Sequence, residues 1–205
     1  IWVAKKRYIL NTHDVEGVRY KKPKLKIMGV EAVKSSTPAA CREKIKDALK
    51  IIMNEDSKVL NSFIQDFRKD FMNLKPEMVA YPRSVNGLNK WTESHNLFKK
   101  GAPIHVKGAI LYNHLVKDKK LQGKYPYIQE GDKIKFLHMK TPNTYQSTSI
   151  SFMTKLPEEL NLNNFVNYEM QFEKSFVEPL KFITDIINWQ IDGSYGTQGT
   201  LEDFF

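Results

Sequence analysis

Apolar residues recur at helical spacing in four stretches of this chain of 205 residues. The pattern predicts helices over residues 34–53, 57–74, 106–117 and 168–189. Ser36 or Thr37 can cap the first helix, and Pro179 should kink or break the last. The first two helices are expected to pack as a hairpin, through the apolar residues Cys41, Ile45, Ala48, Leu49 and Ile52 of one and Val59, Leu60, Phe63, Ile64, Phe67 and Phe71 of the other. Cys41 is therefore interpreted as a core residue rather than a nucleophile.

Extended segments lie mainly near the start of the chain. Residues 3–10 and 18–20 are predicted to form a hairpin, with Asp14, Glu16 and Gly17 supplying the turn. Residues 24–28 form a third extended piece, residues 131–139 alternate as a strand does, and residues 76–103 are predicted to be irregular. Helices combined with short hairpin strands indicate an α+β fold.

The charge of the chain is unevenly distributed. Lys and Arg number 32 and Asp and Glu 23, a net charge of +9, and residues 1–50 and 99–140 carry net charges of +8 and +7. Residues 51–98 are neutral overall, and residues 141–205 carry −6. Two basic blocks favour a polyanionic partner such as nucleic acid over small-molecule chemistry. A single cysteine excludes an internal disulfide and a Cys-based zinc site, and no apolar run approaches the roughly 20 residues of a membrane span.

No catalytic centre is visible in the sequence. The five histidines show no metal-ligand spacing, and neither a phosphate-binding glycine loop nor a Gly-x-Ser-x-Gly motif occurs. The chain alone does not look like a complete enzyme.

The strongest local signal is the run Lys5-Lys6-Arg7-Tyr8 in a predicted strand. Alternation would send Lys5 and Arg7 to one face and Lys6 and Tyr8 to the other. A lysine beside an aromatic ring suits the phosphates and the minor-groove acceptors that all base pairs share, so such a contact reads pairing geometry rather than sequence.

The surroundings of this run resemble the end of the palm of family B DNA polymerases, above all those that replicate T-even-type bacteriophages. The likeness covers essentially the whole chain in collinear order. Its main motifs are Lys5-Lys6-Arg7-Tyr8, Glu16-Gly17, Pro23-Lys24-Leu25-Lys26-Ile27-Met28-Gly29, Lys34-Ser35-Ser36-Thr37-Pro38, Ile104-His105-Val106-Lys107-Gly108, Leu111-Tyr112-Asn113, Glu130-Gly131-Asp132-Lys133 and Phe172-Glu173-Lys174-Ser175-Phe176.

The resemblance implies that residues 1–30 are the last strands of the palm and residues 31–191 a mostly helical thumb that wraps the product duplex and contains a small β element. It further implies that primer–template DNA contacts a set of basic and polar residues: Lys5, Lys6, Tyr8, Lys34, Ser35, Lys107, Tyr112, Asn113, Lys117 and Lys174, with Ser36 as a further phosphate ligand. Lys6 is expected at the minor groove. Glu178 stands where phage relatives have a second basic residue, which disfavours a backbone contact there.

The family's metal-binding aspartate motifs are not present in this sequence, and neither are its nucleotide-binding helix and its exonuclease domain. The resemblance therefore implies that Mg²⁺ is bound by the palm, fingers and exonuclease part of the polymerase. This chain would be a C-terminal part, either of a naturally split polymerase or cut from a continuous one. It is expected to act in the cytoplasm of the infected bacterial host, without a membrane partner.

The end of the sequence has the spacing of a sliding-clamp-binding peptide, with Gln198, Leu201, Phe204 and Phe205 as the clamp-binding residues. Residues 192–200 form a predicted flexible linker that would let this tail reach a clamp on the same DNA.

The leading hypothesis is a duplex-holding part of a DNA-directed DNA polymerase that is not active by itself and is tethered to the sliding clamp. The alternative is a free-standing adaptor that binds double-stranded DNA and recruits a clamp. An RNA-binding protein is disfavoured because no RNP-type aromatic strand or Gly-x-x-Gly loop occurs.

Overall fold

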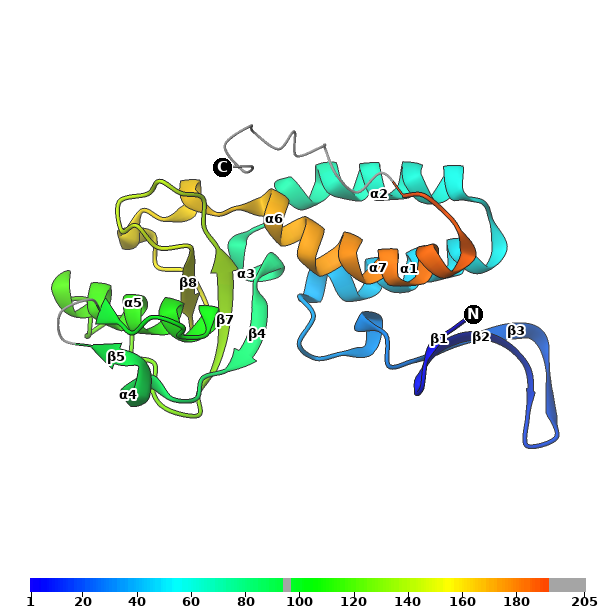
Figure 1. The fold of residues 1–205 in the computed structure, drawn as a ribbon, viewed down its shortest axis with the longest axis horizontal. Coiled ribbons are helices and arrows are strands. Elements are labelled where there is room, and N and C mark those ends of the chain that lie inside the picture. The colour runs from blue at the N-terminus through cyan, green and yellow to red at the C-terminus, as the bar shows by residue number, and fades with distance from the viewer. Residues whose placement is uncertain (94–96, 192–205) are drawn as a thin grey trace. The chain divides into compact units, whose positions relative to one another are not determined.

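A computed structural model describes residues 1–93 and 97–191 of the chain. The described residues form two compact units (Figure 1). Unit 1 contains residues 1–34, 41–70 and 172–191, and unit 2 contains residues 35–40 and 71–171. Helices and small antiparallel sheets occur together, which confirms the predicted α+β class.

The sheet of unit 1 has three antiparallel strands in the order β1 (Trp2–Ala4), β2 (Arg7–Val15) and β3 (Val18–Met28). The prediction of one strand over residues 3–10 is wrong, because Lys5 and Lys6 form a two-residue turn in which Ala4 pairs with Arg7. Lys6 has φ of +62° in this turn, which places its backbone in the left-handed region that the second central residue of a type II turn also occupies. The alternation predicted for Lys5 and Lys6 is therefore wrong as well.

The turn between β2 and β3 is formed by Glu16 and Gly17, as predicted. Both have positive φ, at +52° and +81°, which is the signature of a type I′ turn. Asp14 lies within β2 and pairs with Arg19 instead of joining the turn. β3 runs without interruption over the two extended pieces predicted at residues 18–20 and 24–28.

Two long helices supply much of the core of unit 1. α1 (Ala39–Asn54) buries the whole stripe predicted for it, and it begins after Pro38 rather than at residue 34. In α2 (Ser57–Met72), Leu60, Ile64, Phe67 and Phe71 are buried, but Val59 is 43% exposed, contrary to the prediction. Asp56 caps α2, since its Oδ1 accepts hydrogen bonds from the N–H groups of Lys58 and Val59 at 2.9 and 3.0 Å.

The predicted last helix is continuous but irregular around Pro179, where the sequence predicted a kink or break. It consists of α6 (Tyr168–Phe172), a π-helical segment η4 (Glu173–Val177), α7 (Glu178–Thr184) and a 3-10 turn η5 (Asp185–Ile187). Pro179 has no N–H to donate to the carbonyl one turn earlier, so the regular ladder fails at this point.

This irregular helix packs against α2 and α1 through aromatic and small residues. The ring of Phe67 lies 5.7 and 4.7 Å from those of Phe172 and Phe176. Cys41 Sγ lies 3.2 Å from Ser175 Oγ, and burial raises the pKa of the Cys41 thiol to about 12 despite this hydrogen bond. The interpretation of Cys41 as a core residue is confirmed.

Unit 2 is built on the antiparallel sheet β4 (Tyr81–Ser84), β7 (Lys133–His138) and β8 (Ser149–Phe152), in that order. α5 (Ile104–Asp118) packs on β8, close enough that a Cβ added at Gly108 would lie 2.6 Å from Ser151 Oγ. The Ser149 and Ser151 hydroxyls donate to the carbonyls of Ile104 and His105, both at 2.8 Å. α5 and β7 were predicted, whereas β4 and β8 were not.

Shorter elements complete the described chain: η1 (Glu31–Val33) in unit 1, and α3 (Pro76–Val79), α4 (Leu88–Trp91), β5 (Thr92–Glu93), β6 (Leu97–Phe98), η2 (Glu158–Leu160) and η3 (Asn163–Phe165) in unit 2. Among the helices in residues 1–93 and 97–191, none is both long and apolar enough to cross a membrane.

Candidate nucleic-acid interface

The turn between β1 and β2 presents two lysines to solvent. Lys5 and Lys6 are exposed, and neither forms an ion pair within the described residues. Beside the turn, the rings of Trp2 and Tyr8 stack with their centroids 4.7 Å apart and their planes at 13°. Cations next to an aromatic surface are the combination that binds phosphates and the sugars or bases beside them.

The backbone of this turn is held by a distant glycine. Gly29 has φ of +66°, and a Cβ at this position would lie 2.3 Å from the carbonyl oxygen of Lys6. Only a residue without a side chain allows the Lys6 carbonyl to come this close. Gly29 therefore fixes the position of the Lys5–Lys6 turn.

Lys34, predicted to bind phosphate, is already engaged within unit 1. Glu31 accepts hydrogen bonds from Lys34 Nζ at 2.8 Å and from Arg7 Nη2 at 2.6 Å. Burial opposes ionisation of Glu31, but the hydrogen bond from Lys34 and the charge of Arg7 outweigh it and lower the pKa of this carboxyl. The three side chains together carry a net charge of +1. Lys34 therefore attracts an anion less strongly than an isolated lysine would. Ser35 is exposed.

Lys174 is exposed in the π-helical segment, with its Nζ 3.6 Å from a carboxylate oxygen of Glu178. Glu178 is the residue that the sequence singled out as disfavouring a backbone contact. The ion pair supplies the physical reason, since any phosphate at Lys174 must compete with this carboxylate.

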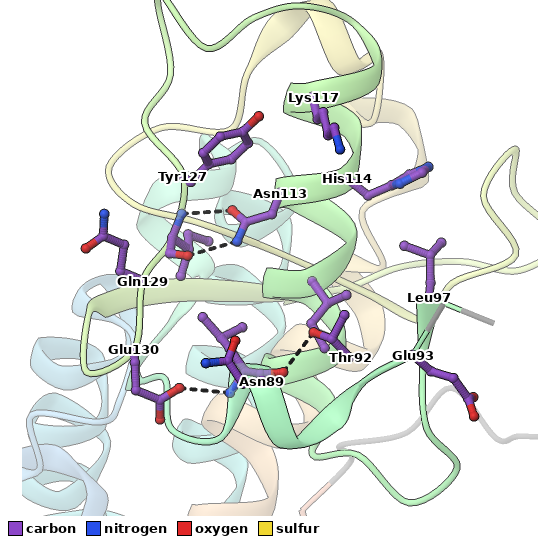
Figure 2. A pocket seen from close by; sticks show the side chains of 13 residues that line it. Asn89, Thr92, Glu93, Leu97, Asn113, His114, Lys117, Tyr127, Gln129 and Glu130 are labelled. Atoms are coloured by element: carbon purple, nitrogen blue, oxygen red, sulfur yellow. Dashed lines mark hydrogen bonds between the residues drawn. The ribbon is translucent and has the colours of Figure 1, made fainter. Parts of the chain in front are cut away.

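Two of the predicted contact residues on α5 are engaged with the backbone of residues 126–128. Tyr112 is 2% exposed, its hydroxyl donates to the carbonyl of Pro126 at 3.2 Å, and burial raises its pKa to about 12. The Asn113 amide accepts from the N–H of Ile128 and donates to its carbonyl, each at 2.8 Å (Figure 2). Both residues hold the segment around Ile128 against α5 through these hydrogen bonds.

The outward side of α5 is basic. Lys107, His114 and Lys117 are spaced by seven and three residues, which places them on one side of a helix. Lys117 also lines an open pocket of about 1030 Å³, together with Tyr127 and Gln129 (Figure 2).

A lysine-lined recess lies at the start of this basic side. Lys99, Lys100 and Lys107 line a recess of about 460 Å³ with Phe98 and Glu93. The Nζ of Lys107 lies 5.6 Å from the centroid of the Phe98 ring. Three ammonium groups against one carboxylate make the recess suitable for a phosphate. Lys99 and Lys100 were not predicted individually, although both lie in the second basic block of the sequence.

Two other predictions bear on the site. The clamp-binding residues Gln198, Leu201, Phe204 and Phe205 lie outside the described residues. Within residues 1–93 and 97–191, no group of three or more His, Cys, Asp or Glu side chains could hold a metal ion.

Comparison with known proteins confirms the resemblance to phage DNA polymerases. No protein-family model matches the chain. It is 31% identical over 183 residues to the DNA-directed DNA polymerase of Enterobacteria phage T4, covering 87% of this chain and 20% of that polymerase. It is 32% identical over 209 aligned residues to the DNA-directed DNA polymerase of Escherichia phage RB69, covering 100% of this chain and 22% of that polymerase. The chain thus spans about a fifth of the length of these relatives.

Proposed function

We propose that this chain, similar along its length to phage DNA-directed DNA polymerases, is the part of such an enzyme that holds the primer–template duplex. The observation that carries the proposal is the presentation of lysine amines by both units. Unit 1 presents them at the Lys5–Lys6 turn, and unit 2 in the recess of Lys99, Lys100 and Lys107.

These lysines suit a duplex better than a small anion. Double-stranded DNA carries one negative charge per ~1.7 Å of its axis. Amines that are spread over a surface can therefore neutralise several of its phosphates at once. Lysine ammonium groups at flexible side-chain ends contact phosphates without reading the bases, which matches a protein that must move along any sequence.

In this proposal, residues 1–30 are the end of the palm and residues 31–191 the thumb of a family B enzyme. The chemistry, extension of a primer by deoxynucleoside triphosphates with Mg²⁺, takes place on carboxylates elsewhere in the polymerase. This chain contributes binding and alignment of the product duplex in the infected bacterial cell. The remaining polymerase part is either a separate polypeptide or continuous with this chain.

The duplex-binding role predicts that the affinity for duplex falls steeply as the salt concentration rises. It also predicts that removing the lysines of the recess makes this dependence less steep. Replacing Lys99, Lys100 and Lys107 together with alanine should flatten the plot of log affinity against log salt by about 0.9 for each phosphate that is no longer neutralised. Fluorescence anisotropy of a labelled primer–template at several salt concentrations measures this slope.

A triple variant at Lys46, Lys50 and Lys155 provides the matched control. Each of these lysines is paired with a carboxylate three positions away, at 2.8 Å, so the variant removes the same charge from outside the recess. Its salt slope should stay close to that of the unmodified chain. Equal slopes for the two triple variants would show that overall charge, not the recess, binds the duplex.

We also propose that the tail tethers the polymerase to a sliding clamp through Gln198, Leu201, Phe204 and Phe205. Deleting residues 201–205 from the assembled polymerase should abolish clamp-dependent synthesis of long products and leave short extension unchanged. Product lengths on a primed circular template, with and without the clamp, measure the effect. Persistence of clamp-dependent long products after the deletion contradicts this role.

The alternative function is a free-standing adaptor that binds double-stranded DNA and recruits a clamp. The similarity to polymerases over 87–100% of the chain favours the polymerase part. Primer extension separates the two, because only a polymerase part should restore nucleotide incorporation when it is combined with the remainder of the enzyme.

A further inference from the structure

The open pocket beside α5 has the size of a ligand site. It encloses about 1030 Å³ within unit 2, between α4, β5, β6, α5 and residues 127–130 (Figure 2). Pockets that bind small organic ligands usually measure ~300–1,000 Å³. The duplex contacts of the proposed function lie at the Lys5–Lys6 turn and in the lysine-lined recess, so they leave this pocket without a role.

The walls of this pocket are tied together by hydrogen bonds. The Asn113 amide on α5 bonds both the N–H and the carbonyl of Ile128, each at 2.8 Å. The carboxylate of Glu130 accepts from the N–H groups of Gly87 and Leu88, the second at 2.9 Å, where α4 begins. Residues 127–130 are therefore fixed to α5 on one side and to α4 on the other. A pocket that is formed in advance loses little conformational entropy when a ligand binds.

The lining of the pocket offers flat apolar contact. Leu88, Ile110 and Ile128 are at most 9% exposed and form an apolar wall. The ring of Tyr127 is 39% exposed, and its hydroxyl accepts a hydrogen bond from Gln122 Nε2 at 3.1 Å, which anchors the ring beside the pocket. An exposed and anchored aromatic ring is a surface on which any nucleobase stacks.

Polar groups in the lining match the edge of a base. Asn89 and Gln129 carry exposed amides, and neither amide forms a hydrogen bond with another described residue. Each amide offers a donor and an acceptor, the pair of groups through which Asn and Gln recognise base edges. Figure 2 shows both amides and the ring of Tyr127 lining the same space. A base stacked on Tyr127 therefore has hydrogen-bonding partners within the pocket.

Cations suited to phosphates lie on two sides of the pocket. His114 and Lys117, both exposed, line it from α5. Glu93 lines both the pocket and the lysine-lined recess, so the two cavities adjoin. Glu130 also lines the pocket, but its carboxylate is already bound by backbone N–H groups. A strand with one base in the pocket would therefore place its neighbouring phosphates in the recess.

We propose that this pocket binds the base of an unpaired nucleotide, with the adjoining phosphates on Lys117 and in the lysine-lined recess. The bases of a duplex are paired and stacked, so they cannot enter without being turned out of the helix. The inference goes beyond the proposed function, which concerns only the paired part of a primer–template. A single strand and a free nucleotide present the same base and phosphate. The several amines of the recess favour the strand, because it carries a phosphate at every nucleotide.

Binding of the full chain to a labelled single strand of about ten nucleotides tests the inference. Tyr127→Ala should lower the affinity for this strand about tenfold in fluorescence anisotropy, because it removes the ring on which a base stacks. Tyr127→Phe keeps the ring and should retain the affinity, which separates stacking from a loss of folding. The affinity for a blunt duplex of the same length should be the same for the unmodified chain and both variants.

Tyr145 provides the control position. It is a half-buried tyrosine of unit 2 outside the pocket lining, and Tyr145→Ala should leave the affinity for the single strand unchanged. An abasic strand of the same length carries the same phosphates without bases. It should bind the unmodified chain and the Tyr127→Ala variant equally.

Competition with deoxyadenosine monophosphate distinguishes the two sources of the ligand. Displacement of the labelled strand only at far higher concentration than the unlabelled strand requires identifies the single strand as the ligand. Displacement at a similar concentration identifies the free nucleotide. Both results support a site for an unpaired nucleotide.

Three outcomes overturn the inference. The first is an equal affinity of the unmodified chain and the Tyr127→Ala variant for the single strand, including the absence of any binding. The second is an equal loss in Tyr145→Ala. The third is an equal loss with the blunt duplex or the abasic strand. A failure of the proposed function is distinguishable, because it appears as a salt slope for duplex that does not change when the lysines of the recess are replaced.

Discussion

Replacing Gly29 with alanine should weaken duplex binding about tenfold, although Gly29 itself contacts no DNA in our proposal. The new Cβ would lie 2.3 Å from the Lys6 carbonyl oxygen and 3.4 Å from Arg7 Cα, so the backbone of the turn must move. The positive φ of +66° adds a strain of about 1–2 kcal/mol for a residue with a side chain. Displacing the Lys5–Lys6 turn moves both ammonium groups. Anisotropy with a labelled primer–template measures the affinity, and thermal unfolding measures the strain.

Gly17→Ala is the matched control for this substitution. Gly17 also has a positive φ, of +81°, but nothing lies within 4 Å of the position that its Cβ would occupy. The control should lose a similar amount of stability to strain and keep its affinity for duplex. An equal loss of affinity in both variants would mean that general weakening of the sheet, rather than the position of the turn, is responsible.

The largest loss of stability is expected for Gly108→Ala in α5. A Cβ there would lie 2.7 Å from the backbone N of Ser151 and 2.8 Å from the carbonyl carbon of Ile150. Backbone atoms cannot rotate away, so α5 must withdraw from β8, and this breaks the hydrogen bond from Ser151 to His105. Overpacking of this kind costs about 1–3 kcal/mol, and the broken hydrogen bond about 1 kcal/mol more. Denaturant unfolding should show the sum as a lower midpoint.

Gly123→Ala tests whether this effect is local to the helix–sheet contact. Gly123 has no atom within 4 Å of its Cβ position, and its φ is not in the left-handed region. Its free energy of unfolding should change by no more than about 0.5 kcal/mol. A loss at Gly108 no greater than that at Gly123 would show that α5 can shift away from β8 at little cost.

The helices were predictable because burial of one face imposes its period on the sequence. Every residue of the stripe predicted for α1 is buried, and the irregular turn just before Pro179 is consistent with the missing N–H of this proline. The limits of the stripe were less predictable. Val59 lies one position before the fully buried Leu60, about 100° around the helix, so it falls beside the buried face of α2 rather than on it.

The turn at Lys5 and Lys6 was beyond prediction for a different reason. The run of residues 3–10 is compatible with a continuous strand, and the turn depends on Gly29, more than twenty residues later. Short strands such as β8, in which serine occupies half of the positions, also lack the apolar enrichment that identifies strands.

The candidate site shows a similar division. Basic blocks in the sequence indicate where positive charge is concentrated, but they do not say which lysines converge, and the recess of Lys99 and Lys100 depends on how β6 leads into α5. A family resemblance aligns positions without giving the direction of their side chains. Tyr112 and Asn113 match polar positions of the family, yet in this chain they bond to the backbone of Pro126 and Ile128.

The π-helical segment η4 holds one residue more than an α-helical turn would, because the N–H of Glu178 bonds the carbonyl of Glu173 five positions earlier. Removing one residue from Glu173–Val177 would let this segment close as a regular α-helical turn, so the helix on either side keeps its facing. A residue removed from α7 itself has no such reserve, and everything after it would turn by about 100°. That change would take Phe182 out from beneath Arg7 and misalign the helix that supports the lysine-bearing sheet.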